Sequence, residues 1–189
     1  MIILGIDPGS LITGVGLIET DGNRFHVLEA VPLRLKKAGE IPQRLLLLAT
    51  ELETKVRAHR PDVVSLEKVF HGKNFQSALV LGYVRGVILM LAARYEIPVA
   101  EYAATEVKKA VCGYGKADKA QVQEMVRLLL NLPTVPKPPD VADALAMTFV
   151  SPDIPFLSGE RAYEDRADVQ KEREGQEEEF DPLDRKSVV

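Results

Sequence analysis

Four acidic side chains lie at positions from which a fold could bring them together. Asp7 and Glu67 each end an apolar run, and Asp140 and Asp143 stand three residues apart at the start of a helix-like segment, so they would share one helix face. Divalent cations such as Mg²⁺ prefer oxygen ligands, and a pair of such ions can stabilise both the attacking and the leaving oxygen of a phosphodiester. The pattern predicts that these four carboxylates are the catalytic ligands of a two-metal site.

Each of these acids also has a plain structural explanation. Asp7 could start a turn, and Glu67 could lie at a solvated strand end. Asp140 is an N-cap candidate, and Asp143, placed in the first turn, would favour the helix dipole. The combination favours a site, because ligands gather at strand ends in open α/β sheets. Grouped carboxylates without cations would also raise one another's pKa values, which makes a poor structural device.

Basic and aromatic residues accompany the acids. Lys119 is predicted at a helix start, where free N–H groups already attract phosphate. Phe70 follows the second apolar run and could stack on an unpaired base or act as a wedge; a buried core position is the alternative. An isolated lysine is more often simply solvated. The candidate DNA contacts are Phe70, Lys73, Arg85, Lys108, Lys109 and Lys116.

The elements that must position these side chains follow from hydrophobic periodicity and turn chemistry. Three strands joined by short turns predict an antiparallel meander, and later strands alternate with helices. The expected class is therefore α/β, with a mixed five-stranded sheet flanked by helices. The expected strands cover residues 1–6, 13–18, 25–31, 62–69 and 98–102, and the expected helices cover 42–59, 74–95, 105–111, 118–130 and 140–150.

The predicted helix from Asn74 to Tyr95 is apolar nearly all round, which a surface helix without a partner would not be. Gly82 and Gly86 stand four residues apart and would permit close helix packing. Two interpretations stay open: a central core helix, or the interface of a homodimer.

Composition divides the chain into two parts. Residues 1–150 are expected to form the nuclease domain, and residues 151–189 form an acidic tail. The tail holds 6 basic and 12 acidic residues, whereas residues 1–150 hold 18 basic and 16 acidic ones. The tail is poor in large apolar groups and is predicted to be disordered. Without the four candidate ligands the domain is net positive, as a nucleic-acid-binding surface requires.

Other features limit the protein's setting. No apolar stretch is expected to span a membrane, the first apolar run lacks the basic lead of a signal peptide, and Cys112 is the single cysteine. We therefore expect a cytoplasmic protein without membrane association.

The densest motifs resemble the RuvC family of bacterial Holliday junction resolvases over about residues 2–150. They are ILGIDPGS, TGVG, LEKVFHGKN, SALVLGYVRGV, EYAATEVKKAV, GYGKADKAQVQEMVR and DVADALA. The resemblance implies an RNase H-like fold. It places the family's catalytic acids on the four carboxylates, its junction-contacting aromatic on Phe70, and its catalytically important lysines on Lys108 and Lys119.

The resemblance also implies an activity and its partners. The expected enzyme is a homodimer that uses the helix Asn74–Tyr95, cuts two opposing strands of a four-way DNA junction symmetrically, and cooperates with the RuvA–RuvB branch-migration complex. The expected cofactor is Mg²⁺, two ions per subunit, with Mn²⁺ as a possible substitute. The turn Ser10-Leu11-Ile12 departs from the pattern, because relatives often carry a basic residue there.

Three other functions remain as alternatives. Actin-like ATPases and sugar kinases share a Gly-Ile-Asp strand and turn, but they need two such domains and only one copy is visible. A non-catalytic junction-binding protein would have degenerate acids. Another RNase H-like nuclease would act on RNA or on hybrids.

Overall fold

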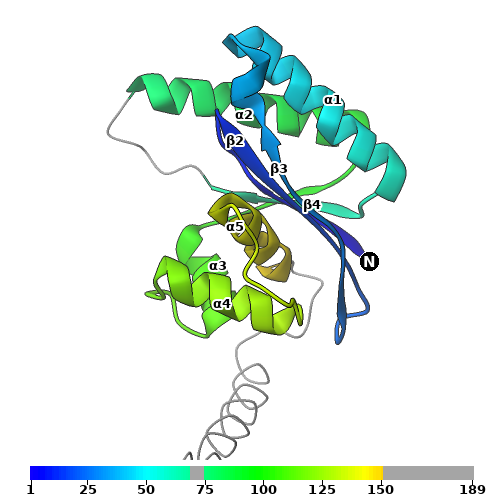
Figure 1. The fold of residues 1–189 in the computed structure, drawn as a ribbon. Coiled ribbons are helices and arrows are strands. Elements are labelled where there is room, and N and C mark those ends of the chain that lie inside the picture. The colour runs from blue at the N-terminus through cyan, green and yellow to red at the C-terminus, as the bar shows by residue number, and fades with distance from the viewer. Residues whose placement is uncertain (69–74, 151–189) are drawn as a thin grey trace, which may run out of the picture.

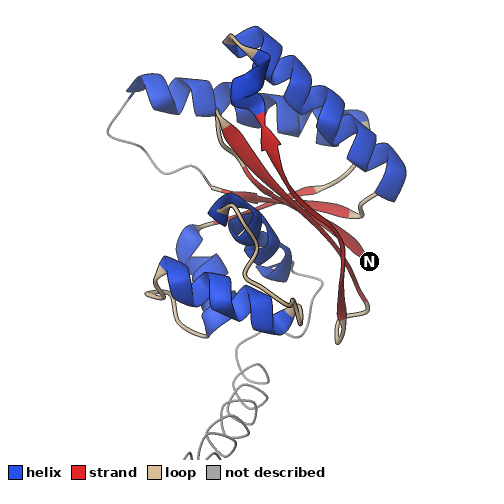
Figure 2. Ribbon diagram, viewed as in Figure 1, coloured by secondary structure: helices blue, strands red, loops and turns tan. Residues whose placement is uncertain are grey.

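The computed structural model describes residues 1–68 and 75–150. Within them the chain forms one mixed sheet with helices on both faces (Figures 1 and 2). The predicted disorder of the tail and the expected roles of Phe70, Lys73 and the helix start at Asn74 lie outside the described residues.

The sheet has five strands in the order β3-β2-β1-β4-β5. β1 and β4 are parallel, β4 and β5 are parallel, and the pairs β1–β2 and β2–β3 are antiparallel. The mixed sheet and its opening meander are therefore confirmed. The strands are β1 (Ile2–Asp7), β2 (Ile12–Thr20), β3 (Phe25–Arg34), β4 (Val63–Glu67) and β5 (Val99–Tyr102).

Two helical layers cover the sheet, as Figure 1 shows. Alternate strand residues such as Leu4 and Ile6 face the first layer, while Ile3 faces the second. This period of two sends Gly5 and Asp7 to the same side as Ile3. The first layer consists of α1 (Ile41–His59) and α2 (Phe75–Arg94), and the second of α3 (Ala104–Cys112), α4 (Lys119–Leu129) and α5 (Pro139–Met147).

Several element boundaries differ from the prediction, the end of β3 and both ends of α5 among them. β3 continues through Pro32 to Arg34, because it is an edge strand where a proline without an N–H is tolerated. The short 3₁₀ helix η1 (Leu35–Ala38) that follows was not predicted. A second 3₁₀ turn, η2 (Thr148–Val150), ends the described chain.

One face of α2 is exposed and apolar. Val84, Ile88, Leu91 and Ala92 are buried in the hydrophobic core, so in the single chain α2 is a core helix along one face only. The mean hydropathy of α2 is 1.6, so by length and composition alone this helix could cross a membrane. No segment of that kind was expected from the sequence. The exposed apolar side chains on this helix are Phe75, Leu79, Tyr83, Leu89 and Met90.

Candidate active site

The ends of two central strands place the first two acids side by side. β1 and β4 are parallel neighbours, with Ile6 opposite Leu66, so the next residues along, Asp7 and Glu67, end adjacent strands. Strand periodicity turns both side chains toward the layer that contains α5. This is the edge at which open α/β sheets collect ligands.

Glycines let α5 lie directly on this part of the sheet. Gly14 pairs with Asp7 across β2, and a Cβ at Gly14 would come within 1.9 Å of the backbone oxygen of Asp140. A Cβ at Gly5 would come within 2.1 Å of the backbone oxygen of Ala144. Contacts this close are available only to residues without a side chain. The two glycines therefore bring the acid-bearing helix against the end of β1.

The start of α5 differs from the one expected when Asp140 and Asp143 were considered as helix-stabilising residues. Pro138 is the N-cap, Pro139 begins the helix, and Asp140 lies in the first turn, so the N-cap interpretation of Asp140 is wrong. Proline is favoured at the first helical position because its N–H would be unpaired there anyway. Asp143 falls beyond the first turn, where the helix dipole would favour it less.

These elements enclose an open cleft of about 390 Å³. Acids from three elements, two lysines and several apolar side chains line it. Asp140 does not line the cleft, although its charge acts on Asp7. The lining residues are Asp7, Glu67, Ala104, Val107, Lys108, Lys119, Val122, Asp143, Ala146 and Met147.

The electrostatics of the cleft show a deficit of positive charge. Burial, followed by the charges of Asp143, Glu67 and Asp140, raises the pKa of Asp7 from 3.8 to about 7. Burial and the charge of Asp143 also raise the pKa of Glu67. Such shifts in a cleft are typical of functional carboxylates. A cation bound here would relieve both desolvation and repulsion.

Lys119 provides the nearest positive charge. Its Nζ lies 2.7 Å from Oδ2 of Asp143, and this hydrogen bond, together with the surrounding acids, raises the lysine's pKa. Lys119 is the first residue of α4, whose N-cap Asp118 accepts a hydrogen bond from the Gln121 amide. A cation at a helix N-terminus opposes the helix dipole, so its placement there is better explained by the site than by helix stability.

The donor set suits a hard divalent cation in chemistry and charge. Carboxylate oxygens are the ligands that Mg²⁺ prefers. Burial and the neighbouring acids raise the pKa of Asp7, and a bound cation would offset both effects. Among residues 1–68 and 75–150, however, no three Asp, Glu, His or Cys side chains form a ready-made ligand cluster. Three of the four predicted ligands, Asp7, Glu67 and Asp143, thus share the cleft without forming a coordination sphere, and Asp140 acts on Asp7 by its charge.

The other predicted contacts divide into several groups. Lys108 lines the cleft, whereas Lys109 and Lys116 are exposed outside it. Phe70 and Lys73 lie outside the described residues. The Arg85 side chain is only 13% exposed and is bound to Glu101, so the structure places it inside the fold rather than on an open DNA-binding surface.

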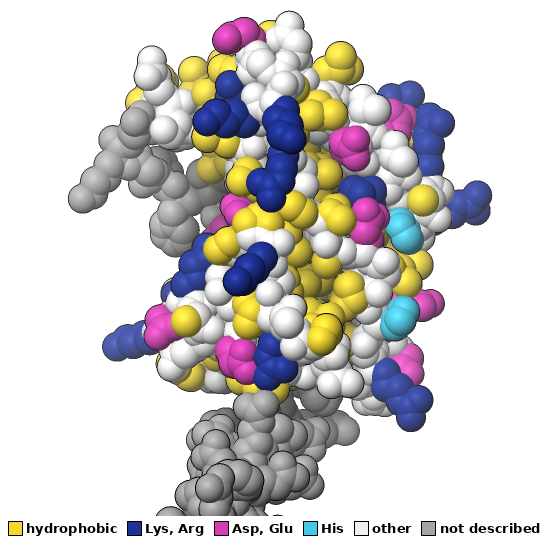
Figure 3. All heavy atoms as spheres, in the orientation of Figure 1, with side chains coloured by type: hydrophobic (Ala, Val, Ile, Leu, Met, Phe, Trp, Pro, Cys, Tyr) yellow, Lys and Arg dark blue, Asp and Glu magenta, His cyan; other side chains and the backbone are white. Residues whose placement is uncertain are grey.

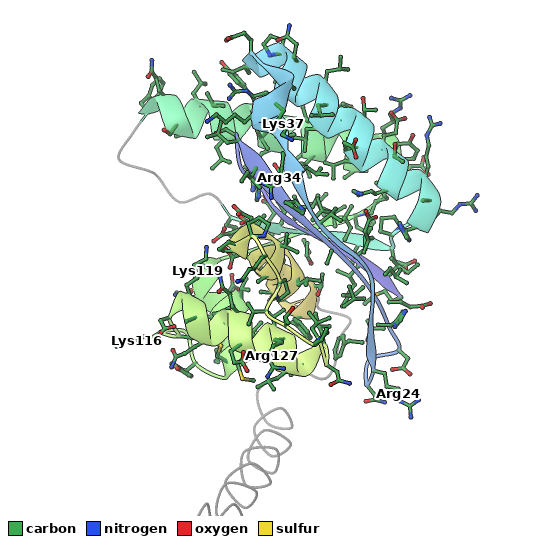
Figure 4. The ribbon with its side chains drawn as sticks, in the orientation of Figure 1. Arg24, Arg34, Lys37, Lys116, Lys119 and Arg127 are labelled. Carbon is green, nitrogen blue, oxygen red and sulfur yellow. The ribbon has the colours of Figure 1, made fainter. Side chains whose placement is uncertain are left out.

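The predicted DNA contacts did not include a basic segment, residues 34–37, at the end of β3. The amides of Leu35 and Lys36 donate to the backbone oxygen of Leu11, at 2.9 and 3.2 Å, which joins this segment to the turn after Asp7. Arg34 and Lys37 are exposed on the face that also carries Lys119 (Figure 4), and dark-blue side chains follow that face in Figure 3. The run Arg-Leu-Lys-Lys at 34–37 was the available signal.

Comparison with known proteins agrees with this geometry. Residues 3–151 match the family model described as "Crossover junction endodeoxyribonuclease RuvC". The chain belongs to the RuvC family. A RuvC protein of Ruminiclostridium cellulolyticum is 48% identical over 147 residues, covering 78% of this chain and 89% of the relative. One from Heliobacterium modesticaldum is 49% identical over 147 residues, covering 78% and 91%.

Solved RuvC structures share the fold. Thermus thermophilus RuvC superposes with a TM-score of 0.73 at 29% identity, covering 79% of this chain and 92% of that one. The same protein in complex with a Holliday junction substrate gives a TM-score of 0.73 at 26% identity, with the same coverage. The RNase H-like fold predicted for the chain is thereby confirmed, and the actin-like alternative is excluded.

Proposed function

We propose that this protein resolves Holliday junctions by symmetric, metal-dependent hydrolysis of two opposing DNA strands. Membership of a family of crossover junction endodeoxyribonucleases supports the reaction class. The structural observation that carries the proposal is the meeting of Asp7, Glu67 and Asp143 with Lys119 in one cleft at the ends of β1 and β4. The solved complex of Thermus thermophilus RuvC with a junction supports the substrate.

Asp7, Glu67, Asp140 and Asp143 would hold two Mg²⁺ ions per subunit, with Mn²⁺ able to replace them. When bound, such ions activate water and stabilise the leaving oxygen of a phosphodiester. Asp7 is the central ligand in this proposal, because each of the other three acids acts on its charge. The products would carry 5′-phosphate and 3′-hydroxyl ends.

Lys119 would supply positive charge to the phosphate that is being cut. Its ammonium group already lies among the acids, with Nζ 2.7 Å from Oδ2 of Asp143, and these acids further favour its charged form. A fixed cation aimed at developing charge stabilises the transition state more than the ground state. Lys108, which lines the same cleft from α3, would bind the phosphate with it.

DNA binding would extend along the basic face beyond the cleft. Arg34, Lys37 and Lys116 are exposed there with Lys119 (Figures 3 and 4). The segment 34–37 would supply the backbone contact that the turn at Leu11 lacks. Lys109 remains a candidate contact on α3, and Phe70 and Lys73 remain candidates for contacts at the crossover. Phosphate contacts predict a steep dependence of affinity on salt.

The exposed face of α2 would form the interface of a homodimer. Three of its exposed apolar side chains, Phe75, Leu79 and Tyr83, stand four residues apart, and a Cβ at Gly82 or Gly86 would meet nothing within 4 Å in the single chain. A stripe of this kind suits close packing against a second helix. A two-fold dimer would present a pair of sites to a junction that has the same symmetry. Such burial also removes the need for a membrane, so we propose a cytoplasmic dimer that cooperates with RuvA–RuvB.

Mapping nicks on a synthetic four-way junction tests this function. We expect paired cuts at symmetry-related positions in opposing strands with Mg²⁺ or Mn²⁺, and no cuts in a chelator. A linear duplex of the same sequence and an RNA–DNA hybrid serve as comparison substrates. Preferential cutting of the hybrid would instead assign the protein to another RNase H-like activity.

A further inference from the structure

Arg85 is a charged residue in the middle of the apolar helix α2, and its side chain reaches the sheet. Its Nη1 donates a hydrogen bond of 2.5 Å to the backbone oxygen of Glu67, and its Nη2 forms an ion pair with Glu101. The side chain is only 13% exposed. One guanidinium group therefore joins α2 to the ends of β4 and β5.

A guanidinium withdrawn from water is stable only if its donors are satisfied. The two partners of Arg85 meet that requirement with charge and geometry that suit its rigid planar fork. The same strand ends are joined by a further hydrogen bond of 2.8 Å, from the Lys68 amide to the backbone oxygen of Tyr102. Arg85 thus belongs to the bonding that fixes where β4 ends.

We infer that Arg85 is a positioning residue that holds Glu67 at the edge of the catalytic cleft. The bond to the Glu67 backbone oxygen fixes the residue from which the carboxylate projects. Glu101, on the neighbouring strand, holds the guanidinium in place. This inference rests on the proposed function of Glu67 as a metal ligand. Groups that orient a metal ligand typically change metal affinity or activity ~10–100-fold when they are removed.

Free-protein binding of Mn²⁺, measured by calorimetry, tests the inference without DNA. We expect Arg85→Gln to weaken Mn²⁺ binding ~10–100-fold and to raise the Mn²⁺ concentration needed for cleavage by a similar factor. Arg94→Gln is the matched control. It removes the same charge from the same helix, but Arg94 is 58% exposed and lies 3.8 Å from its partner Glu53, so binding should not change.

Two further variants refine the test. Glu101→Gln leaves the bond to the Glu67 backbone oxygen and should weaken Mn²⁺ binding less than Arg85→Gln does. Arg85→Lys keeps the charge but offers a single donor group, so we expect an intermediate loss. Arg85→Lys also replaces Arg85→Gln if the latter does not fold. Wild-type Mn²⁺ affinity in a folded Arg85 variant would overturn the inference.

A direct DNA contact by Arg85 would give a different result. Junction affinity in chelator would then fall in Arg85→Gln, and the slope of affinity against salt would decrease by about one. We expect neither change, because the Arg85 guanidinium is already bound to the Glu67 backbone oxygen and to the Glu101 carboxylate. Either change accompanied by normal Mn²⁺ binding would overturn the inference and return Arg85 to the DNA-binding surface.

Hydrogen exchange separates this inference from the proposed function. We expect the amide of Lys68 to exchange faster in Arg85→Gln than in wild type, and Arg94→Gln to leave it unchanged. An unchanged rate in Arg85→Gln would overturn the positioning role even if wild type cuts junctions. Failure of wild type to bind Mn²⁺ or to cut a junction would overturn the proposed function instead.

Discussion

Replacing Asp7 by asparagine should abolish cleavage and at the same time stabilise the metal-free protein. The folded protein raises the pKa of Asp7 from 3.8 to about 7, because the carboxyl is buried among other acids. Between those two values the folded protein retains a proton that the unfolded chain has released. The charge of Asp7 therefore lowers the free energy of unfolding progressively as pH rises through this window. Asparagine is neutral at every pH and removes the effect.

The magnitude follows from linkage. Raising the pKa of Asp7 from 3.8 to about 7 corresponds to at most ~4 kcal/mol above pH 7, and to roughly 1.5–2 kcal/mol near pH 5. Relaxation around the cleft and new contacts of the amide reduce both figures, so we expect a gain of ~1–3 kcal/mol near pH 8. The gain of the variant over wild type should increase by ~1–2.5 kcal/mol between pH 5 and pH 8.

Urea unfolding in chelator, at equal protein concentration, measures both quantities. Glu19→Gln, which removes an exposed carboxylate from β2, is the matched control and should show no comparable gain. Addition of Mn²⁺ should cancel or reverse the advantage, because the ion stabilises only the form that binds it. An Asp7→Asn variant that is no more stable than wild type near pH 8, or whose advantage does not depend on pH, would refute the electrostatic reasoning.

Three other perturbations have expected outcomes. Lys119→Ala should reduce single-turnover junction cleavage ~10²–10³-fold while leaving binding in chelator largely intact; equal losses of binding and cleavage would make Lys119 a simple DNA contact. Gly14→Ala should lower the free energy of unfolding by ~1–3 kcal/mol and abolish cleavage, because the new Cβ would meet the Asp140 backbone oxygen; a normal urea midpoint would contradict this packing. Met90→Glu should convert the dimer to monomers in sedimentation experiments, with Leu46→Glu, an exposed leucine of α1, as the control; a dimeric Met90→Glu protein would remove α2 from the interface.

Local pattern was sufficient for most of the fold. Turn chemistry at Asp7-Pro8-Gly9, the apolar runs that became β1 and β4, and the alternation along β2 predicted a mixed sheet, because these signals act over a few residues. Boundaries were missed where tertiary context decided them. β3 passes through Pro32 because it lies at the sheet edge, and α5 begins at Pro139 because Pro138 takes the cap position.

The site was predicted in its residue types more than in its contacts. Acids at the ends of apolar runs pointed to Asp7 and Glu67, since strand ends meet at one edge of the sheet. The internal pairing of Arg85 could not be predicted, because its partners lie on β4 and β5 and depend on how α2 packs. The contribution of Gly14 likewise needed the position of α5, which is distant in sequence.

Anomalous diffraction from crystals of the wild-type protein with Mn²⁺ tests the metal assignment most directly. We expect anomalous peaks within coordination distance of the Asp7 carboxylate, shared with Glu67 or with the acids of α5, and no such peaks in Asp7→Asn. Ordered Mn²⁺ only at other positions, in protein that cuts a four-way junction with Mn²⁺, would contradict the assignment of these carboxylates as the catalytic centre.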